Sequence, residues 1–163
     1  MPKPTVYLDS TIPSAYFDDR PGRSSQRLVT RLWWEAARTE YDFISSTVLR
    51  DEVGRGSRRD RAEARLRLIC DVPVVDISPE IRELADWYIL HKLMPARPDA
   101  DAVHLATAAV LKCEYLATWN FGHLANQNKA VHLAVLNRRR GLSVPRICTP
   151  DTLMDDDDNC GNR

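Results

Sequence analysis

Near its N-terminus the chain reads Thr5-Val6-Tyr7-Leu8-Asp9-Ser10-Thr11. Residues 5–8 are apolar, aromatic or β-branched, a composition that predicts a short buried strand. Asp9 ends this strand, and Ser10 opens a helix with Pro13 in its first turn, where proline is favoured. A buried strand that ends at a carboxylate and leads into a helix indicates an α/β protein.

Strands and helices continue to alternate along the chain. Further strands are expected at residues 42–46, 72–77, 115–118 and 146–148. Further helices are expected to begin near Ser24, Thr47, Arg58, Ser78, Asp99 and Lys129. This order predicts a three-layer α/β/α sandwich around a mostly parallel central sheet. Residues 1–153 would form this domain, and residues 154–163, with four consecutive aspartates, would form an acidic, disordered tail.

The composition excludes several classes of protein. The 163 residues fit one domain, and 23 basic and 23 acidic residues give zero net charge, which argues against nucleic-acid binding over the whole surface but not against a local basic patch. Because no apolar run is long enough to span a membrane and no signal peptide is visible, we expect a cytoplasmic protein. The absence of a Cys-x-x-Cys pair excludes zinc ribbons and thioredoxin-like chemistry; Cys70, Cys113 and Cys148 are expected in the core.

Four acidic or amide residues lie where predicted elements begin or end: Asp9, Glu52, Asp101 and Asn120. Asp9 and Asn120 each follow a strand, and ligands of parallel sheets bind beyond the carboxyl ends of the strands. A carboxylate that loses its hydration is costly unless it is compensated, and divalent metals such as Mg²⁺ compensate it through oxygen ligands. The spacing alone leaves open whether the four residues meet.

Each of these positions also has an ordinary structural explanation. Asp9 is a common type of cap for the helix that follows it. Glu52 is suited to pair with Arg50 or Arg55 on the surface of a helix. His104, on an otherwise apolar helix, is more typical of a hydrogen-bonded core histidine than of a metal ligand. None of the positions therefore indicates a site by itself.

Taken together and in order, the motifs resemble those of PIN-domain nucleases, in particular the VapC-type toxins of bacterial toxin–antitoxin pairs. The matching segments are Tyr7-Leu8-Asp9-Ser10-Thr11, the isolated Glu52, residues 101–108 and residues 116–121. The resemblance covers almost the whole chain and implies a PIN-like fold. It further implies an endoribonuclease that depends on Mg²⁺ or Mn²⁺ and hydrolyses RNA phosphodiesters.

The resemblance also implies a role for each matching residue. Asp9 and Asp101 would bind the metal, Glu52 would bind it through water or act as a base, and Asn120 would complete the site. A metal lowers the pKa of a bound water and stabilises charge on the phosphate. Asn120 stands where many members of the family have a fourth Asp, which leaves the site with one charge fewer. The side chains expected to orient the carboxylates or contact the substrate are Ser10, Thr118 and His123.

Two further features have both a structural and a functional interpretation. Arg55, Arg58 and Arg59 begin an arginine-rich run that forms either a solvated helix face or a surface for RNA phosphates. Trp119, beside the presumed site, either packs in the core or stacks on a base.

The resemblance implies three partners: an RNA substrate, an antitoxin segment that covers the acidic groove, and a second copy of the chain. Such toxins commonly dimerise through helices, so Trp33, Trp34 and the helix around Trp87 are candidates for the interface. Packing within the chain is the first explanation for all three tryptophans.

Three other functions were weighed against the nuclease. A haloacid-dehalogenase-like phosphatase needs a second acid two residues after Asp9, where Thr11 stands. A phosphoacceptor receiver domain needs an acidic pair after its first strand, which Ser10 breaks, and a Lys after its fifth strand, which is missing. A degenerate PIN domain that binds RNA or a protein without cleavage stays open, because Asn120 replaces an acidic residue.

Overall fold

Five parallel strands form the centre of the computed structural model, which describes residues 2–160 and, within them, side chains up to residue 155. The strands are β1 (Thr5–Leu8), β2 (Asp42–Ser46), β3 (Val74–Val75), β4 (Tyr115–Ala117) and β5 (Arg146–Cys148). Their order in the sheet is β3-β2-β1-β4-β5, and every neighbouring pair is parallel. The predicted parallel sheet is confirmed.

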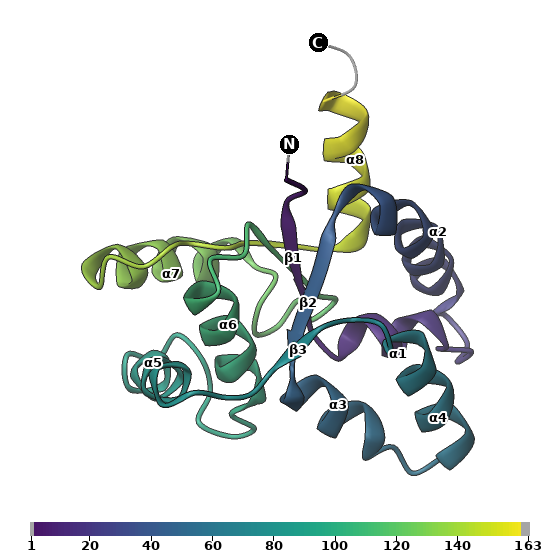
Figure 1. The fold of residues 1–163 in the computed structure, drawn as a ribbon, viewed down its shortest axis with the longest axis horizontal. Coiled ribbons are helices and arrows are strands. Elements are labelled where there is room, and N and C mark those ends of the chain that lie inside the picture. Colours follow the sequence, from purple (N-terminus) through teal and green to yellow (C-terminus); the bar gives the residue numbers. More distant parts are fainter. Residues whose placement is uncertain (1, 161–163) are drawn as a thin grey trace.

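Helices cover both faces of this sheet. They are α1 (Thr11–Tyr16), α2 (Ser24–Glu40), α3 (Thr47–Gly54), α4 (Arg59–Leu68), α5 (Pro79–Leu90), α6 (Ala100–Val110), α7 (Gln127–Arg139) and α8 (Pro150–Cys160). Figure 1 shows α5, α6 and α7 on one side of the strands and α1, α2, α4 and α8 on the other, as the predicted three-layer sandwich requires. Within the described part of the chain, no helix is both long and apolar enough to cross a membrane.

The central strand β1 joins the two cores of the protein. Val6 and Leu8 point into the core beneath α1 and α2, whereas Tyr7 points into the core beneath α5 and α6. Alternation of side chains along a strand produces this division. Leu8 pairs with Ala117 of β4, so the residues that follow β1 and β4 leave the sheet at the same edge. The carboxylate of Asp9 is thereby placed beside the end of a second strand.

Strand β3 is shorter than the predicted strand at 72–77. Pro73 has no N–H to donate, although its carbonyl accepts a hydrogen bond from Ser45 N–H at 2.9 Å. The N–H of Val72 donates to the carbonyl of Ile69 at 3.0 Å, so Val72 belongs to the turn after α4. Proline is tolerated beside a short strand at the edge of a sheet, which is the position of β3.

Helix α8 occupies most of the segment that was predicted to be a disordered tail. Leu153 is fully buried, and Met154 packs against the same core as α2. Asp151 lies in the first turn, where a negative charge is favoured by the helix dipole. Residues 154–160 of the predicted tail are thus assigned to α8, and residues 161–163 lie outside the described residues.

Three expectations about single side chains are corrected by their burial. Trp33 and Trp34 are both buried, with ring centroids 5.5 Å and 5.1 Å from that of Phe43, so they pack within the chain and are not available to a dimer interface. Cys70, which was expected in the core, is exposed at the end of α4. The neighbouring apolar residues misled the prediction because they face inward while Cys70 faces outward.

Candidate active site

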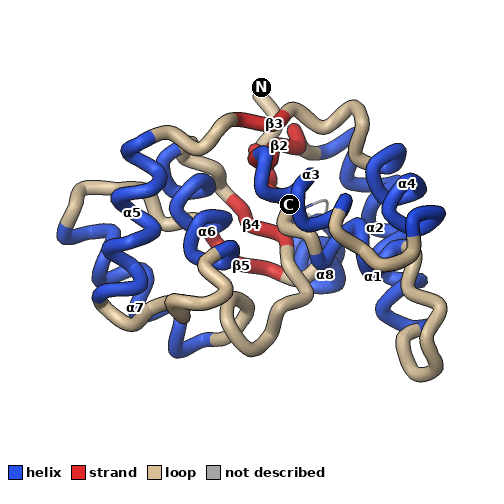
Figure 2. Tube along the Cα trace, turned by 90° about the horizontal axis from the view of Figure 1, so that it is seen from below, coloured by secondary structure: helices blue, strands red, loops and turns tan. Residues whose placement is uncertain are grey.

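The residues of the candidate site lie at the edge of the sheet where the parallel strands end. Figure 2 looks onto this end of the molecule, to which β1 and β2 run in Figure 1. Asp9 directly follows β1, Asp101 lies in the first turn of α6, and Asn120 lies in the loop after β4. Glu52 comes from α3, which follows β2 directly. Four distant segments of sequence therefore meet at one edge.

Asp9 is almost completely buried, with 1% of its surface exposed. Its Oδ1 accepts hydrogen bonds from the backbone N–H of Thr11 at 3.0 Å and from the Thr11 hydroxyl at 2.5 Å, and its Oδ2 accepts one from the Thr118 hydroxyl. Burial raises the pKa of Asp9 to about 6, although the charge of His104 and the hydroxyl hydrogen bonds oppose the rise. The N-cap of α1 is Ser10, and the bond from Thr11 N–H ties the Asp9 carboxylate to the first residue of that helix. The structural explanation of Asp9 is therefore supported, and its role as a metal ligand stays a prediction.

Glu52 is paired with a buried histidine instead of a surface arginine. Its Oε2 lies 2.8 Å from Nε2 of His104, whose Nδ1 lies 2.7 Å from the Tyr7 hydroxyl. That hydroxyl also lies 2.9 Å from Oγ of Ser46. A protonated His104 donates from both nitrogens, and the Tyr7 hydroxyl then donates onward to Ser46. His104 is thus the hydrogen-bonded core histidine that the sequence suggested, although the sequence did not indicate its link to Glu52.

The pKa shifts of this pair favour a charged histidine and a charged glutamate at neutral pH. Burial alone would lower the pKa of His104, but Tyr7 and the carboxylates of Glu52 and Asp9 raise it to about 10. Burial alone would raise the pKa of Glu52, but the hydrogen bond and charge of His104 outweigh it and lower that pKa. A hydrogen bond from Ser10 and the charge of Arg55 lower the pKa of Glu52 further.

Asp101 lies at the start of α6 and is held by the loop after β4. Its Oδ2 accepts a hydrogen bond from Nδ2 of Asn120 at 3.0 Å and lies 2.8 Å from Nδ1 of His123. Asn120 is held in turn, because its Oδ1 accepts the N–H of His123 at 3.0 Å and its own N–H donates to the Thr118 hydroxyl at 2.9 Å. His123 is the most exposed member of this group.

Hydrogen bonds join Asp9, Asn120 and Asp101 into one network, whereas Glu52 and His104 belong to a second one. Thr118 contacts both Asp9 and Asn120, and Asn120 contacts Asp101. Asp101 and His104 are one turn apart on α6 and therefore share a face of that helix. Across the described residues, no three His, Cys, Asp or Glu side chains form a preassembled metal cluster. The carboxylates therefore lie near one another without forming a complete set of metal ligands among the described residues.

The residues present nevertheless suit a hard divalent cation. Carboxylate and amide oxygens are the ligands that Mg²⁺ and Mn²⁺ prefer. The raised pKa of Asp9 means that the protein alone does not compensate the charge of this buried carboxylate. A cation beside Asp9 would supply that compensation.

Sequence reasoning missed one residue that the geometry makes important. Thr11 donates twice to Asp9, and its hydroxyl also accepts the backbone N–H of Trp119 at 2.8 Å. It therefore ties the end of β1 to the loop after β4. The only signal was its place two residues after Asp9, which had served to reject a phosphatase and not to assign Thr11 a position in the site.

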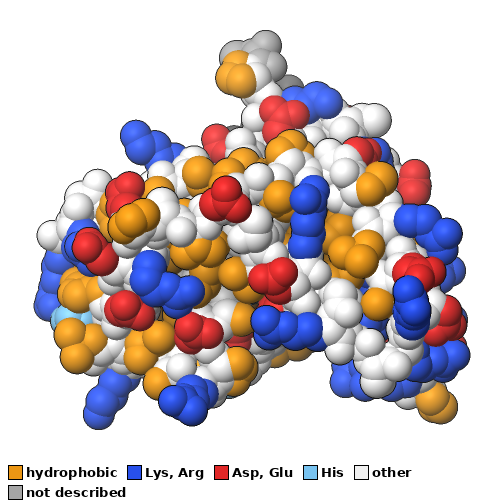
Figure 3. Space-filling model, turned by 60° about the horizontal axis from the view of Figure 1, so that its bottom comes forward, with side chains coloured by type: hydrophobic (Ala, Val, Ile, Leu, Met, Phe, Trp, Pro, Cys, Tyr) orange, Lys and Arg blue, Asp and Glu red, His pale blue; other side chains and the backbone are white. Residues whose placement is uncertain are grey.

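The arginines near α4 are divided between structural and exposed positions. Arg61 binds both carboxylate oxygens of Asp19, at 2.6 Å and 2.7 Å, and so holds α4 to the loop before α2. Arg58 and Arg59 are exposed, with longer contacts to Asp60 at 3.6 Å and Glu63 at 3.4 Å. Figure 3, which turns this end of the molecule toward the viewer, shows Lys and Arg side chains gathered at the right, on the side of α4.

The indole of Trp119 is held in place by the protein. Its Nε1–H donates to the Thr30 hydroxyl of α2 at 2.9 Å, and the ring packs against the core beneath α2. The packing interpretation of Trp119 is therefore the one that its contacts support.

With this geometry in view, the chain can be compared with known proteins. The family model described as the PIN domain matches residues 6–122, which contain all four candidate site residues. The chain belongs to the PIN domain family. Comparison of this PIN domain with curated protein sequences gives no match.

Two solved structures share the fold of this PIN domain. One is described as VapBC2 from Rickettsia felis bound to a DNA fragment from their promoter; it is 10% identical, with a TM-score of 0.53 over 89% of this chain and 98% of that one. The other is VapC20 from Mycobacterium tuberculosis, described as a toxin that cleaves the sarcin-ricin loop. It is 17% identical, with a TM-score of 0.54 over 68% of this chain and 86% of that one.

Proposed function

We propose that this PIN domain is a metal-dependent endoribonuclease and the toxin of a toxin–antitoxin pair. The observation that carries the proposal is the hydrogen-bonded network of Asp9, Thr118, Asn120 and Asp101 at the sheet edge. Glu52 lies beside this network because it contacts His104, which is one helical turn from Asp101 on α6. Membership of the PIN domain family supports a nuclease. The cleavage of an RNA loop by the similarly folded VapC20 supports RNA as the substrate.

Asp9 and Asp101 would hold a Mg²⁺ or Mn²⁺ ion, with Asn120 beside them and Glu52 contacting it through water. The bound ion supplies charge stabilisation at the scissile phosphate and lowers the pKa of the attacking water. Glu52, kept anionic by His104, would accept a proton from that water at its carboxylate. Thr11 and Thr118 would fix the orientation of Asp9 by donating to its two oxygens.

The exposed side chains around the site would contact the RNA. His123, at the rim, would donate to a phosphate oxygen, and Arg55, Arg58 and Arg59 would attract the strand toward the site. The partner in the Rickettsia felis structure supports a cognate antitoxin for this chain. With Trp33 and Trp34 buried, the helix around Trp87 is the remaining candidate for a homodimer interface.

A cleavage assay with a matched pair of variants tests the proposal. Total RNA is incubated with the protein in Mg²⁺, in Mn²⁺ and in excess EDTA. Asp101→Asn should reduce cleavage by about 100-fold, since it removes a metal ligand. Asp99→Asn, two residues earlier in the same turn, should leave cleavage unchanged because Asp99 pairs with Arg82 at the surface.

Two results would contradict the proposal of a metal-dependent ribonuclease. Cleavage that persists in EDTA would exclude dependence on a metal. A folded wild-type protein that binds RNA but cuts none of it with either metal would support the degenerate PIN domain, for which the amide at Asn120 is the favouring observation.

A further inference from the structure

An aromatic side chain lies exposed directly beside the candidate active site. Phe121 follows Asn120, and 56% of its surface is exposed. Its ring lies beside that of Trp119, with the two ring centroids 6.1 Å apart. A single exposed apolar residue is common on protein surfaces, so a role for Phe121 has to follow from what lies next to its ring.

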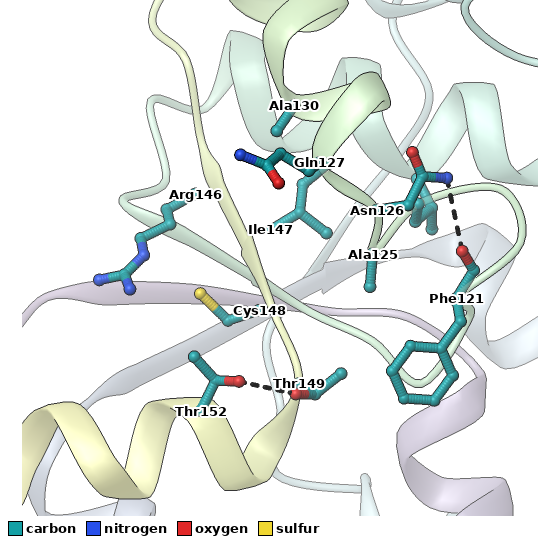
Figure 4. A pocket seen from close by; sticks show the side chains of 11 residues that line it. Phe121, Ala125, Asn126, Gln127, Ala130, Arg146, Ile147, Cys148, Thr149 and Thr152 are labelled. Carbon is teal, nitrogen blue, oxygen red and sulfur yellow. Dashed lines mark hydrogen bonds between the residues drawn. The ribbon is translucent and has the colours of Figure 1, made fainter.

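The ring of Phe121 forms one wall of a hollow of about 290 Å³. Figure 4 shows Phe121 on one side of this hollow, Thr149 and Thr152 beside it, and Gln127 on the opposite side. The apolar part of its surface comes from Leu124, Ala125, Ala130 and Ile147. The hollow thus combines an apolar floor with hydroxyl and amide groups at its edge.

The loop that presents Phe121 is fixed by its own hydrogen bonds. The N–H of Phe121 donates to the carbonyl of Trp119 at 3.0 Å. Nδ2 of Asn126 donates to the carbonyl of Gly122 at 3.1 Å, and Oδ1 of Asn126 accepts the N–H of Lys129 and so caps α7. Residues 120–126 therefore hold Phe121 at a set position before any ligand arrives.

The same loop carries the contacts to Asp101. Asn120 and His123 bind that carboxylate, while Phe121, Leu124 and Ala125 line the hollow. The site and the hollow thus lie on two sides of one short, fixed segment. A ligand that occupies both would pass over this segment.

The size and chemistry of the hollow restrict what it can hold. Its volume is at the lower limit of about 300 Å³ that is typical of small-molecule sites, so it suits one flat group. Bases that are unstacked from single-stranded RNA lie on aromatic side chains and form hydrogen bonds at their edges. An aromatic wall with an amide opposite, from Gln127, and hydroxyl groups beside it matches this pattern.

We propose that the hollow is a subsite for one unpaired nucleobase of the RNA substrate, which stacks on Phe121. The proposal rests on the proposed nuclease function and adds a positioning residue to it. A base held there would fix the adjoining phosphate over the loop that carries Asn120 and His123. The subsite would also restrict the enzyme to single-stranded or loop RNA, because a paired base cannot enter the hollow.

The test measures binding of a fluorescein-labelled 10-nucleotide single-stranded RNA in EDTA, where no cleavage is needed. Phe121→Ala should weaken binding about tenfold, in the range for loss of one stacked base, whereas Phe121→Trp should retain the affinity. Leu28→Ala is the matched control, because Leu28 is a 58% exposed apolar residue on α2. It should bind RNA as the wild-type protein does.

Abasic RNAs identify the base. One abasic position should weaken binding to the wild-type protein about tenfold and should have no effect on binding to Phe121→Ala, since both changes remove the same stack. The dependence of affinity on salt should stay the same in Phe121→Ala, because no phosphate contact is lost. Ala130→Leu, which narrows the hollow, should weaken binding in the same way.

Several results would overturn the subsite. One is wild-type affinity in Phe121→Ala, and another is an equal loss of affinity in Leu28→Ala. A third is a loss in Phe121→Ala that adds to the loss caused by each abasic position in turn. RNA that binds with no abasic-sensitive position would also exclude it, even if the protein cleaves RNA. Conversely, the protein could show one abasic position that weakens RNA binding and still fail to cleave RNA. That result would support the subsite and contradict the proposed nuclease.

Discussion

Asp9 combines deep burial with a charge that the proposed function requires. Its carboxylate lies under α1 with three hydrogen bonds from Thr11 and Thr118, and still its pKa is raised to about 6. The hydrogen bonds therefore do not outweigh the loss of hydration. In the absence of a cation, ionised Asp9 should make the folded state less stable.

Asp9→Asn should stabilise the metal-free protein while it abolishes cleavage. A carboxyl group whose folded pKa is raised contributes most stability below its unfolded pKa of 3.8, and this contribution is lost as the pH rises to about 6. At pH 7.5 in EDTA, the variant should gain about 2 kcal/mol in the free energy of unfolding, measured by urea denaturation. At pH 4 the gain should be absent; equal stability of the two proteins at pH 7.5 would contradict this account of Asp9.

His104→Gln should show the opposite dependence on pH. Because the pKa of His104 is raised from 6.5 to about 10, its protonation stabilises the folded state. This contribution to the free energy of unfolding is fully present below pH 6.5 and is lost as the pH rises toward 10. The lowered pKa of Glu52 gives stability that is lost as the pH falls below 4.5. The free energy of unfolding of the wild-type protein should therefore exceed that of the variant by about 2–4 kcal/mol near pH 5.5, because the variant leaves the partly buried carboxylate of Glu52 without its partner. At pH 9 the difference in unfolding free energy should be smaller. A difference that does not change between these pH values would exclude the charged pair.

Among the elements, α8 differs most from what the sequence predicted. The helix is short of apolar residues overall, and its contribution rests on Leu153, which is fully buried beneath α2. Burial of one leucine contributes roughly 1.5–3 kcal/mol. The segment after β5 should thus be part of the folded domain and not an appendage.

Leu153→Ala should lower the free energy of unfolding by about 2–4 kcal/mol, because it removes buried methyl groups and leaves a cavity. Asp155→Ala, two residues later and exposed, should change it by less than about 0.5 kcal/mol. Thermal or urea denaturation of both variants measures the difference. If Leu153→Ala and Asp155→Ala have the same free energy of unfolding, α8 does not pack against the core as described.

The order of elements was predictable because each strand has a local signature. The apolar run before Asp9 and the segment 115–118 predicted β1 and β4, and the carboxyl-end rule for parallel sheets then placed Asp9 and Asn120 at one edge. The short β3 was not predicted, since its start depends on the turn between Ile69 and Val72 and on the pairing of the Pro73 carbonyl with Ser45 of β2. The same holds for Leu153, whose partner surface is formed by α2.

The detailed geometry of the site could not be predicted from the sequence. The pairing of Glu52 with His104 joins residues that are 52 positions apart and depends on how α3 packs beside α6. The bridge from Thr11 to Trp119 depends on the register between β1 and β4. Motifs indicate which residue types gather in a family, whereas packing decides which atoms they contact.

For the molecule as a whole, the proposed nuclease requires that one edge of the sheet acts as a cation site. Asp9 follows β1, Glu52 lies on α3 and Asp101 on α6, so segments far apart in the sequence supply the three carboxylates.

Binding of Mn²⁺ followed by electron paramagnetic resonance, without RNA, measures this property. The wild-type protein should bind the ion saturably, and Asp9→Asn and Asp101→Asn should each weaken binding by about tenfold or more, whereas Asp99→Asn should not. If the wild-type protein binds no Mn²⁺, or if all three variants bind it as the wild type does, the carboxylates at the sheet edge are not a metal site.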